Sequence, residues 1–71
     1  MYLKRLRDLR EDKDLYQKDI AIMLNISQQY YSEYETGKRS LPLEILIILS
    51  KYYEVSTDYI LGLTNKKERN K

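Results

Sequence analysis

The sequence of 71 residues is long enough for one small domain, and a domain of this size buries only about 60% of the surface that its unfolded chain exposes. The absence of Cys and His excludes disulfides, thiolate nucleophiles, Cys/His metal sites and acid–base catalysis by histidine. The net charge is +2, but the segment after Asn65 carries four cations and one acid, so the rest of the chain is close to −1. A surface that binds nucleic acid would therefore have to use local positive charge.

No stretch of about 18 apolar residues could span a membrane. The N-terminus is charged from Lys4 onward and lacks the apolar segment of a signal peptide. We therefore expect a soluble cytoplasmic protein that makes no membrane contact. The carboxylates and lysines lie on the exteriors of amphipathic segments without a plausible pocket, so the sequence does not favour an enzyme.

Residues 3–12 are predicted to form an amphipathic helix. Leu3, Leu6 and Leu9 recur at every third position and give an apolar stripe beneath a charged face. Most of the charges on that face are expected to be solvated, with Arg10 as the exception.

Residues 12–16 connect this helix to the next one. Two starting points are open: Asp14 could cap a helix that begins at Leu15, or Tyr16 could occupy the cap position, for which tyrosine is poorly suited. Asp19 suits the first turn in either case, because its carboxylate faces the positive end of the helix dipole.

The next two predicted helices, about residues 17–24 and 28–36, are joined by a tight turn. Asn25 tolerates the left-handed backbone angles that are needed where a helix stops and reverses. Ser27 can act as the N-cap of the second helix, and Gly37 ends that helix. The pattern is typical of a helix-turn-helix.

The second of these helices has a polar face and an aromatic face at about 100° per residue. The polar face spans about 140° and carries no full positive charge. Glutamine can bond adenine bidentately, serine can bond several bases, and glutamate can accept from cytosine N4. Polar residues at the start of such a helix are what base recognition in the major groove requires. The expected base-reading residues are Gln28, Gln29, Ser32 and Glu33, with Tyr31 and Tyr34 on the opposite face and Tyr30 beside them.

Lys38 and Arg39 directly follow this helix, in a short loop that ends at Pro42, a residue tolerated at a helix start. Cations at this place could bind phosphates of one strand while the helix lies in the groove. Alternatively, they could complement the negative end of the helix dipole. Given the helix-turn-helix before them, we expect the phosphate role.

Residues 43–53 form the most apolar predicted helix, and a helix that is apolar all round is usually central and buried. Ile45, Ile48 and Tyr52 make a second stripe on it, which we expect to be buried; the alternative is a surface for a protein partner. Its first face contains Leu43, Leu46, Ile47, Ser50 and Tyr53.

Residues 54–63 end the expected domain with a short helix that is capped by Ser56 and terminated by Gly62. Residues 64–71 are polar and charged, and we expect them to form a disordered tail. The sequence therefore predicts one all-helical domain over residues 1–63, followed by this tail.

These motifs together resemble the XRE-type helix-turn-helix family of lambda-like phage repressors and Cro proteins, over about residues 3–63. Each motif alone is weak, but the combination is specific. The matching pieces are L-x-x-L-R-E at Leu6–Glu11; Gln17, Ile20, Ala21 and Leu24; Ile26 and Ser27; Glu35, Gly37, Lys38 and Arg39; Pro42; Leu46; and Val55, Ser56, Asp58, Ile60, Leu61 and Gly62.

The resemblance implies a compact, lambda-repressor-like DNA-binding domain of five helices, in which helices 2 and 3 form the helix-turn-helix. It implies that Gln17 contacts a phosphate and braces Gln28, and that Arg10 pairs with Glu35 to tie the first helix to the third. The phosphate-binding residues that we expect are Arg10, Gln17, Lys18, Ser27, Tyr30, Lys38 and Arg39. The dimer interface that we expect contains Thr57, Tyr59 and Leu63.

Three positions depart from the family pattern. Tyr16 stands where the family usually has Thr or Ser, which leaves the cap and its phosphate contact open, and Asn25 stands where Gly is frequent. Glu33 is an acid at a base-reading position, so that it either accepts from a cytosine or faces Arg or Lys in the free protein.

The favoured function is a sequence-specific transcriptional regulator, a repressor that binds an inverted-repeat operator in double-stranded DNA as a homodimer. Its half-sites would lie about one helical turn apart, roughly 34–36 Å. No cofactor, metal or small-molecule ligand is expected, and the protein would act at the nucleoid as a bacterial or phage protein. The alternative is a protein-interaction module on the same fold, such as an antitoxin, which would use the stripe of Ile45, Ile48 and Tyr52.

Overall fold

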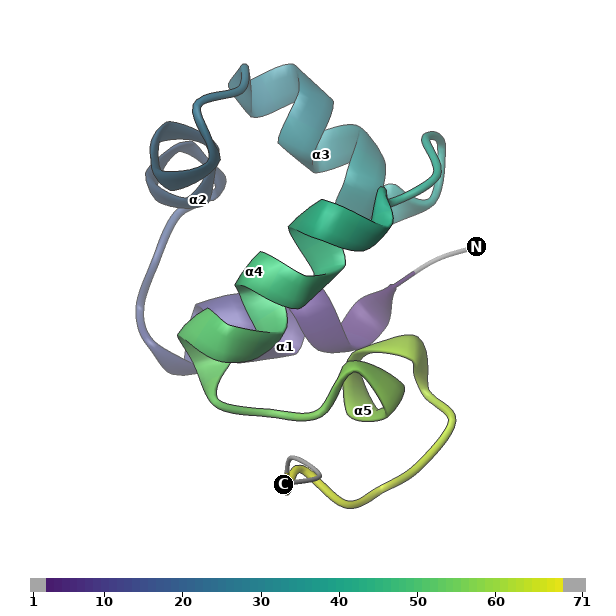
Figure 1. The fold of residues 1–71 in the computed structure, drawn as a ribbon. Helices are drawn as coiled ribbons and strands as arrows, with labels where there is room; N and C mark the ends of the chain where they lie inside the picture. The colour runs from purple at the N-terminus through teal and green to yellow at the C-terminus, as the bar shows by residue number, and fades with distance from the viewer. Residues whose placement is uncertain (1–2, 69–71) are drawn as a thin grey trace.

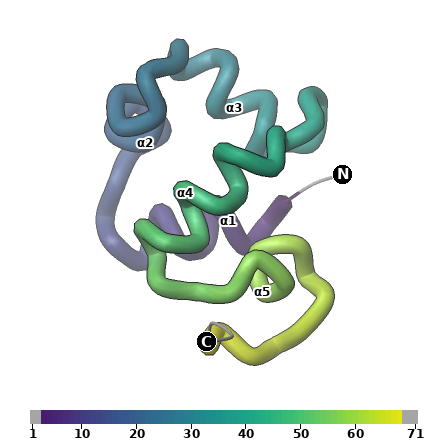
Figure 2. Tube along the Cα trace, viewed as in Figure 1, coloured from purple at the N-terminus to yellow at the C-terminus, as the bar shows by residue number. Residues whose placement is uncertain are grey.

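The computed structural model describes residues 3–68 and shows five helices and no strand within them. The helices are α1 Lys4–Asp12, α2 Gln17–Leu24, α3 Gln28–Thr36, α4 Leu43–Tyr53 and α5 Thr57–Leu61. In Figure 1, α2 and α3 lie at one end of the molecule, α4 crosses in front of α1, and α5 lies at the other end. Figure 2 follows the same path as a trace. The predicted all-helical fold of five helices is confirmed.

The core forms where the apolar stripes of the helices meet. Leu3, Leu6 and Leu9 are buried as predicted, and Leu6 is completely inaccessible. Tyr31 of α3 and Leu49 of α4 are completely inaccessible as well. Full burial of an apolar side chain of this size contributes about 1.5–3 kcal/mol. The core therefore joins α1, α3 and α4, and it holds the helix-turn-helix against the rest of the domain.

The connection between α1 and α2 settles the choice left open by the sequence. Asp14 adopts a left-handed backbone conformation with φ of 57°, and α2 begins at Gln17. Of the two starting points left open, the structure therefore shows the one with Tyr16 at the cap position. Tyr16 occupies the N-cap without a side-chain cap, and its backbone N–H donates to Asp19 Oδ2 at 2.7 Å.

The turn between α2 and α3 agrees with the prediction. Asn25 is left-handed with φ of 58°, and the next N–H, that of Ile26, donates to the carbonyl oxygen of Ala21 at 3.0 Å. Ser27 is the N-cap of α3, where its Oγ accepts from the N–H of Tyr30 at 3.0 Å. These local contacts fix the direction in which α3 leaves the turn.

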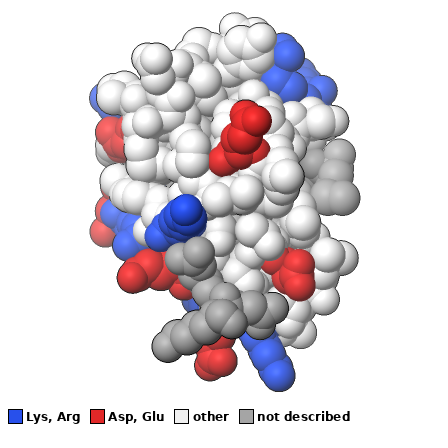
Figure 3. All heavy atoms as spheres, in the orientation of Figure 1, with Lys and Arg blue, Asp and Glu red and all other residues white. Residues whose placement is uncertain are grey.

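The outer face of α4 corrects a prediction. Ile48 is 48% exposed and Tyr52 is 41% exposed, and of the predicted buried stripe only Ile45 packs partly against the core. Leu43 and Ile47, from the first face, are exposed too. The prediction is wrong because α4 packs on the core by one side, and no other helix of the described residues covers its outer side (Figure 1). Figure 3 accordingly shows a largely uncharged surface over the region of α4, interrupted by an acidic and a basic group.

The segment after α5 folds back on the domain. Arg5 of α1 donates to the carbonyl oxygen of Thr64 and to Asn65 Oδ1, the latter at 2.7 Å. The N–H of Ser56 donates to the carbonyl oxygen of Lys67 at 2.8 Å. This part of the predicted tail therefore contacts α1 and the start of α5, whereas the last three residues lie outside the described ones. The predicted domain boundary and the predicted disorder of the tail stay predictions.

Two tyrosine hydroxyls, those of Tyr31 and Tyr53, are buried in the core. Neither has a hydrogen-bond partner of good geometry within the described residues. Burial, together with the nearby Glu35 carboxylate, raises the pKa of both phenols well above that of free tyrosine. The folded protein therefore keeps both phenols neutral at pH values where an exposed tyrosine ionises.

Alkaline pH should consequently destabilise the fold. The pKa of each phenol is higher in the folded state than in the unfolded state. Its contribution to the free energy of unfolding is therefore fully present below about pH 10, the pKa of unfolded tyrosine, and is lost as the pH rises above that value. The free energy of unfolding should decrease by about 1.4 kcal/mol per pH unit for each phenol. Urea unfolding followed by circular dichroism across this range measures the decrease. Tyr53→Phe should remove about half of it, and an equal decrease in wild type and variant would contradict the account.

Candidate functional site

The outer surface of α3 carries the residues that the sequence predicts to read bases. Gln28 and Gln29 are exposed in its first turn, and Ser32 and Glu33, one turn later, are half-buried. Tyr31 lies on the opposite side and is completely buried, as predicted. The fold thus presents two exposed amides at the start of a helix that follows a tight turn. Direct contact of these residues with bases stays a prediction.

Ser27 and Tyr30, two of the predicted phosphate-binding residues, lie at the start of the same helix. Ser27 Oγ uses a lone pair to accept from the Tyr30 N–H, so its own hydroxyl proton can still be donated to a phosphate. Tyr30 is 44% exposed, and its ring stacks against Tyr34 with centroids 6.3 Å apart. Both hydroxyl-bearing side chains are therefore available on the outer side of the turn.

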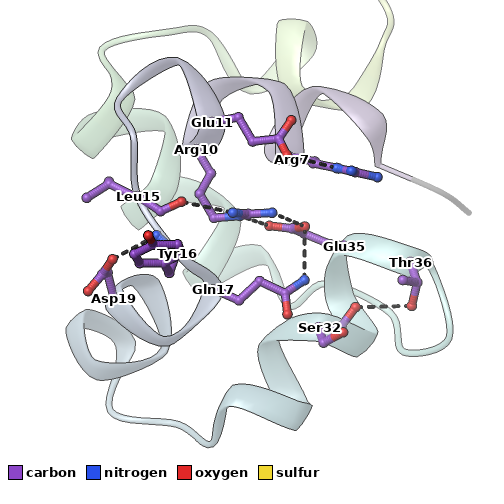
Figure 4. Close-up of polar contacts among 10 residues, drawn as sticks. All are labelled: Arg7, Arg10, Glu11, Leu15, Tyr16, Gln17, Asp19, Ser32, Glu35 and Thr36. Carbon is purple, nitrogen blue, oxygen red and sulfur yellow. Dashed lines mark hydrogen bonds and ion pairs between the residues drawn. The ribbon is translucent and has the colours of Figure 1, made fainter.

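A buried ion pair ties α1 to α3 behind this surface (Figure 4). Arg10 Nε donates to Glu35 Oε2 at 2.8 Å, and Arg10 Nη2 donates to Glu35 Oε1 at 3.3 Å. The remaining group, Nη1, donates to the carbonyl oxygen of Leu15 at 2.9 Å. The two side chains are 10% and 3% exposed, and hydrogen bonding to Glu35 raises the pKa of Arg10. All three nitrogens of this guanidinium are therefore engaged inside the domain.

Gln17 joins the same cluster from the start of α2. Its Nε2 donates to Glu35 Oε1 at 3.3 Å, and in Figure 4 it reaches the carboxylate from the side opposite α1. The cluster therefore joins α1, α2 and α3 at one point and fixes the helix-turn-helix against the first helix. The contacts of Gln17 with Gln28 and a phosphate, and of Arg10 with a phosphate, stay predictions.

The two cations that follow α3 differ in their surroundings. Lys38 and Arg39 are both exposed, but Arg39 Nε and Nη2 lie 3.0 and 2.9 Å from Glu33 Oε1. The Arg39 guanidinium also lies 4.0 Å from the centroid of the Tyr30 ring. Of the two alternatives for Glu33, the free protein therefore shows the contact with a cation. Lys18, the predicted phosphate ligand of α2, is exposed.

An open hollow of about 260 Å³ lies beside these contacts, on the outer side of α3. Within residues 3–68, no group of three or more acidic, His or Cys side chains is placed to hold a metal ion. The residues that line the hollow are Ser27, Gln29, Tyr30, Glu33 and Arg39.

None of the helices in the described part of the chain is long and apolar enough to cross a membrane.

The predicted dimer residues lie in and after α5. Thr57 and Tyr59 are half-buried, whereas Leu63 is 72% exposed. Two cations lie near the Tyr59 ring, with the Arg5 guanidinium 4.3 Å and the Lys67 ammonium 5.8 Å from its centroid. Of the three residues, only Leu63 is largely accessible. The dimer interface stays a prediction.

The contacts of Arg5 were missed by the sequence reasoning, and the cation that faces Glu33 was left unidentified by it. Arg5 donates to the carbonyl oxygen of Tyr59, 54 positions away, and no local pattern in the sequence indicates such a contact. The contact between Arg39 and Glu33 does have a local signal. Gly37 ends α3 in the left-handed conformation with φ of 83°, and this turn brings the N–H of Arg39 back to the Glu33 carbonyl oxygen at 3.2 Å.

Comparison with known proteins gives a family match over most of the chain. A family model described as helix-turn-helix matches residues 6–60. The uncharacterized HTH-type transcriptional regulator YobD of Bacillus subtilis is 43% identical over 65 residues, which are 92% of this chain and 58% of YobD. The HTH-type transcriptional regulator ImmR of the same organism is 39% identical over 67 residues, which are 94% of this chain and 53% of ImmR.

A phage protein is similar over the same region. The cryptic phage CTXphi transcriptional repressor RstR of Vibrio cholerae is 36% identical over 70 residues, which are 99% of this chain and 60% of RstR. The chain therefore spans 53–60% of the length of these three relatives. No solved structure gives a significant match.

Proposed function

Because the chain belongs to the XRE-type helix-turn-helix family, we propose that it is a sequence-specific DNA-binding transcriptional regulator, and more narrowly a repressor. The observation that carries the proposal is the geometry of α3. Its two exposed amides, those of Gln28 and Gln29, begin a capped helix that a tight turn sets apart from α2. The names of the relatives ImmR, a regulator, and RstR, a repressor, point the same way.

In the proposed complex, α3 lies in the major groove with its first turn on the base edges. Each exposed glutamine amide can donate to adenine N7 and accept from adenine N6 at the same time. Ser32 follows one turn later on the same side, where its hydroxyl can bond either a donor or an acceptor of a base. These residues would give the specificity of binding.

Phosphate contacts would flank this helix on both sides. The positive ends of α2 and α3 favour an anion, because their first backbone N–H groups have no partner within the helix. The body of the chain is close to −1 in charge, so local groups must supply the attraction to DNA. The proposed phosphate ligands are Gln17, Lys18, Ser27, Tyr30, Lys38 and Arg39.

Lys38→Ala should weaken binding to every duplex to a similar extent, because a phosphate contact carries no base information. Fluorescence anisotropy at several salt concentrations should show that the slope of log affinity against log salt falls in magnitude by about 1. Lys51→Ala is the matched control: it removes the same charge from the exposed end of α4 and should keep the wild-type slope. A slope for Lys38→Ala that equals the wild-type slope would show that this lysine binds no phosphate.

The proposed regulator acts as a homodimer on an inverted repeat, with α5 near the two-fold axis. Leu63 offers an exposed apolar side chain there, beside the half-buried Thr57 and Tyr59. Half-sites about 34–36 Å apart would let both copies of α3 enter the major groove on one side of the duplex. Such a dimer would act by occupying its operator in the bacterial cytoplasm, where it would block RNA polymerase or contact it.

A second candidate function is protein binding by the outer face of α4. Leu43 is 69% exposed and Ile48 is 48% exposed, and Ile47 and Tyr52 extend the same apolar surface. Exposed apolar surface of this kind is typical of interaction sites. An antitoxin or another protein-binding module on this fold would show a partner-dependent change in size and no binding to DNA.

A further inference from the structure

Glu33 and Arg39, at the end of the predicted base-reading surface, are joined by two side-chain contacts and one backbone hydrogen bond. Arg39 Nε and Nη2 converge on one carboxylate oxygen, Glu33 Oε1, at 3.0 and 2.9 Å. The backbone N–H of Arg39 also donates to the backbone carbonyl oxygen of Glu33 at 3.2 Å. The backbone contact places the start of the Arg39 side chain, so that the guanidinium needs little further ordering to reach the carboxylate.

Tyr30 supplies a second support for the same guanidinium. Its ring lies one helical turn before Glu33, and the Arg39 guanidinium carbon is 4.0 Å from the ring centroid. The cation therefore rests on the face of the ring, while its Nε and Nη2 groups turn toward the carboxylate. Its Nη1 group takes part in neither contact with Glu33 and can donate to another acceptor.

Isolated ion pairs on a surface are weak, and many contribute nothing measurable. This pair differs because Glu33 is 25% exposed in its side chain and Arg39 is held by a ring and a backbone hydrogen bond as well. Both Arg39 contacts use Oε1, so only Oε2 of Glu33 could accept from cytosine N4 while the pair persists. A carboxylate that turned away from Arg39 to the base would enter the negative potential of the DNA as an unpaired anion. Keeping the pair holds Glu33 beside Arg39 and places a cation where phosphates lie, which favours a positioning role for Glu33 over base reading.

We propose that Glu33 is a positioning residue for Arg39 and not a reader of bases. It holds the guanidinium on Tyr30 at the end of the base-reading surface, so that Nη1 of Arg39 meets a phosphate of the DNA backbone when α3 enters the groove. The specificity of α3 then comes from the residues of its first turn and from Ser32. The inference rests on the proposed DNA-binding function and deepens it.

A double-mutant cycle in DNA binding tests the inference. The variants are Glu33→Gln, Arg39→Ala and the double substitution, each measured by fluorescence anisotropy on the duplex that the wild type selects from a random pool. Glu11→Gln is the matched control, because it also removes one acid of an ion pair, at an exposed site of α1. Urea unfolding midpoints are measured for every variant to verify that the fold persists.

Glu33→Gln should weaken binding by about tenfold, although it makes the protein more positive, because the charge-assisted contact that orders Arg39 is lost. Arg39→Ala should weaken binding to a similar extent, and the double variant should bind no more weakly than Arg39→Ala alone. The preference for each base pair should stay as in the wild type. Tyr30→Phe, which keeps the ring, should retain binding better than Tyr30→Ala.

Other results overturn the inference. If Glu33→Gln tightens binding at least as much as Glu11→Gln does, the acid only repels DNA. If Glu33→Gln relaxes the preference at one base pair, and still does so with Arg39→Ala in place, Glu33 reads that base. Additive effects of the two substitutions would mean that the residues act independently. A wild-type protein that binds no duplex would instead overturn the proposed function itself.

Discussion

Glu35→Leu should lower the free energy of unfolding by about 3–5 kcal/mol, because it leaves the Arg10 guanidinium buried without a counterion. Leucine has a similar volume but cannot accept the hydrogen bonds of 2.8 and 3.3 Å that Arg10 donates to the carboxylate. Gln17 Nε2 loses its acceptor in the same variant. Small domains are stable by only about 5–15 kcal/mol, so this loss is a large share of the total. Urea unfolding followed by circular dichroism measures it.

The double variant Arg10→Met/Glu35→Leu distinguishes the destabilisation caused by an unpaired buried charge from that caused by the loss of the contact itself. Replacing both members of a buried pair with apolar residues is often neutral or stabilising, so the double variant should be more stable than Glu35→Leu. It should remain somewhat below the wild type, because the Leu15 carbonyl oxygen loses its donor. If Glu35→Leu loses its cooperative unfolding transition and the double variant regains it, the unpaired charge of Arg10 is likewise the cause of the instability.

A pair of the same type on the surface provides the control for this experiment. Glu11→Gln breaks the exposed pair with Arg7, whose two atoms are 3.3 Å apart, and should change stability by less than about 0.5 kcal/mol. If Glu35→Leu loses no more than this control, the buried cluster does not hold α1 to α3.

Gln28→Ala and Gln29→Ala should each relax the sequence preference at one base pair. A bidentate contact between an amide and adenine discriminates against a wrong base by about 1–3 kcal/mol, so each variant should lose about that much on its operator and less on other sequences. The cap of α3 is untouched, since Ser27 accepts from the Tyr30 N–H. Competition binding against operators changed at one base pair at a time measures the effect.

Thr36→Ala is the comparison for the two glutamine variants. Thr36 is exposed at the end of α3, and its hydroxyl donates to the Ser32 carbonyl oxygen of its own helix at 3.1 Å. Its removal should therefore leave the base preference unchanged. An equal loss of affinity on every sequence, for either glutamine variant, would show that these amides do not read bases.

The elements that the sequence predicts well are those that depend on neighbouring residues. The three leucines before and within α1 recur every third position, and all three are buried. Asn25 and Ser27 have the conformation and the cap that their side chains favour at a turn and a helix start. The family resemblance added the pairing of Arg10 with Glu35, which no local pattern indicates because the two residues are 25 positions apart.

The features that the sequence does not predict depend on what packs against each element. The apolar stripe of α4 would be buried if another helix covered it, but Ile48 and Tyr52 are exposed because no helix of the described residues does so. Asp14 is a residue type that often caps helices, but here its left-handed backbone follows the end of α1, and it does not cap α2. Arg5 resembles any solvated cation of an amphipathic helix until the chain after α5 returns to it.

Selection of bound DNA from a random pool, followed by affinity at increasing salt, is the most direct test of base reading by α3. The account predicts an inverted repeat with half-sites about one helical turn apart, and a steep loss of affinity with salt from the phosphate ligands around α2 and α3. Weak binding without any enriched sequence would contradict base reading by Gln28 and Gln29. That result would favour the second candidate function, in which the exposed face of α4 binds a protein partner.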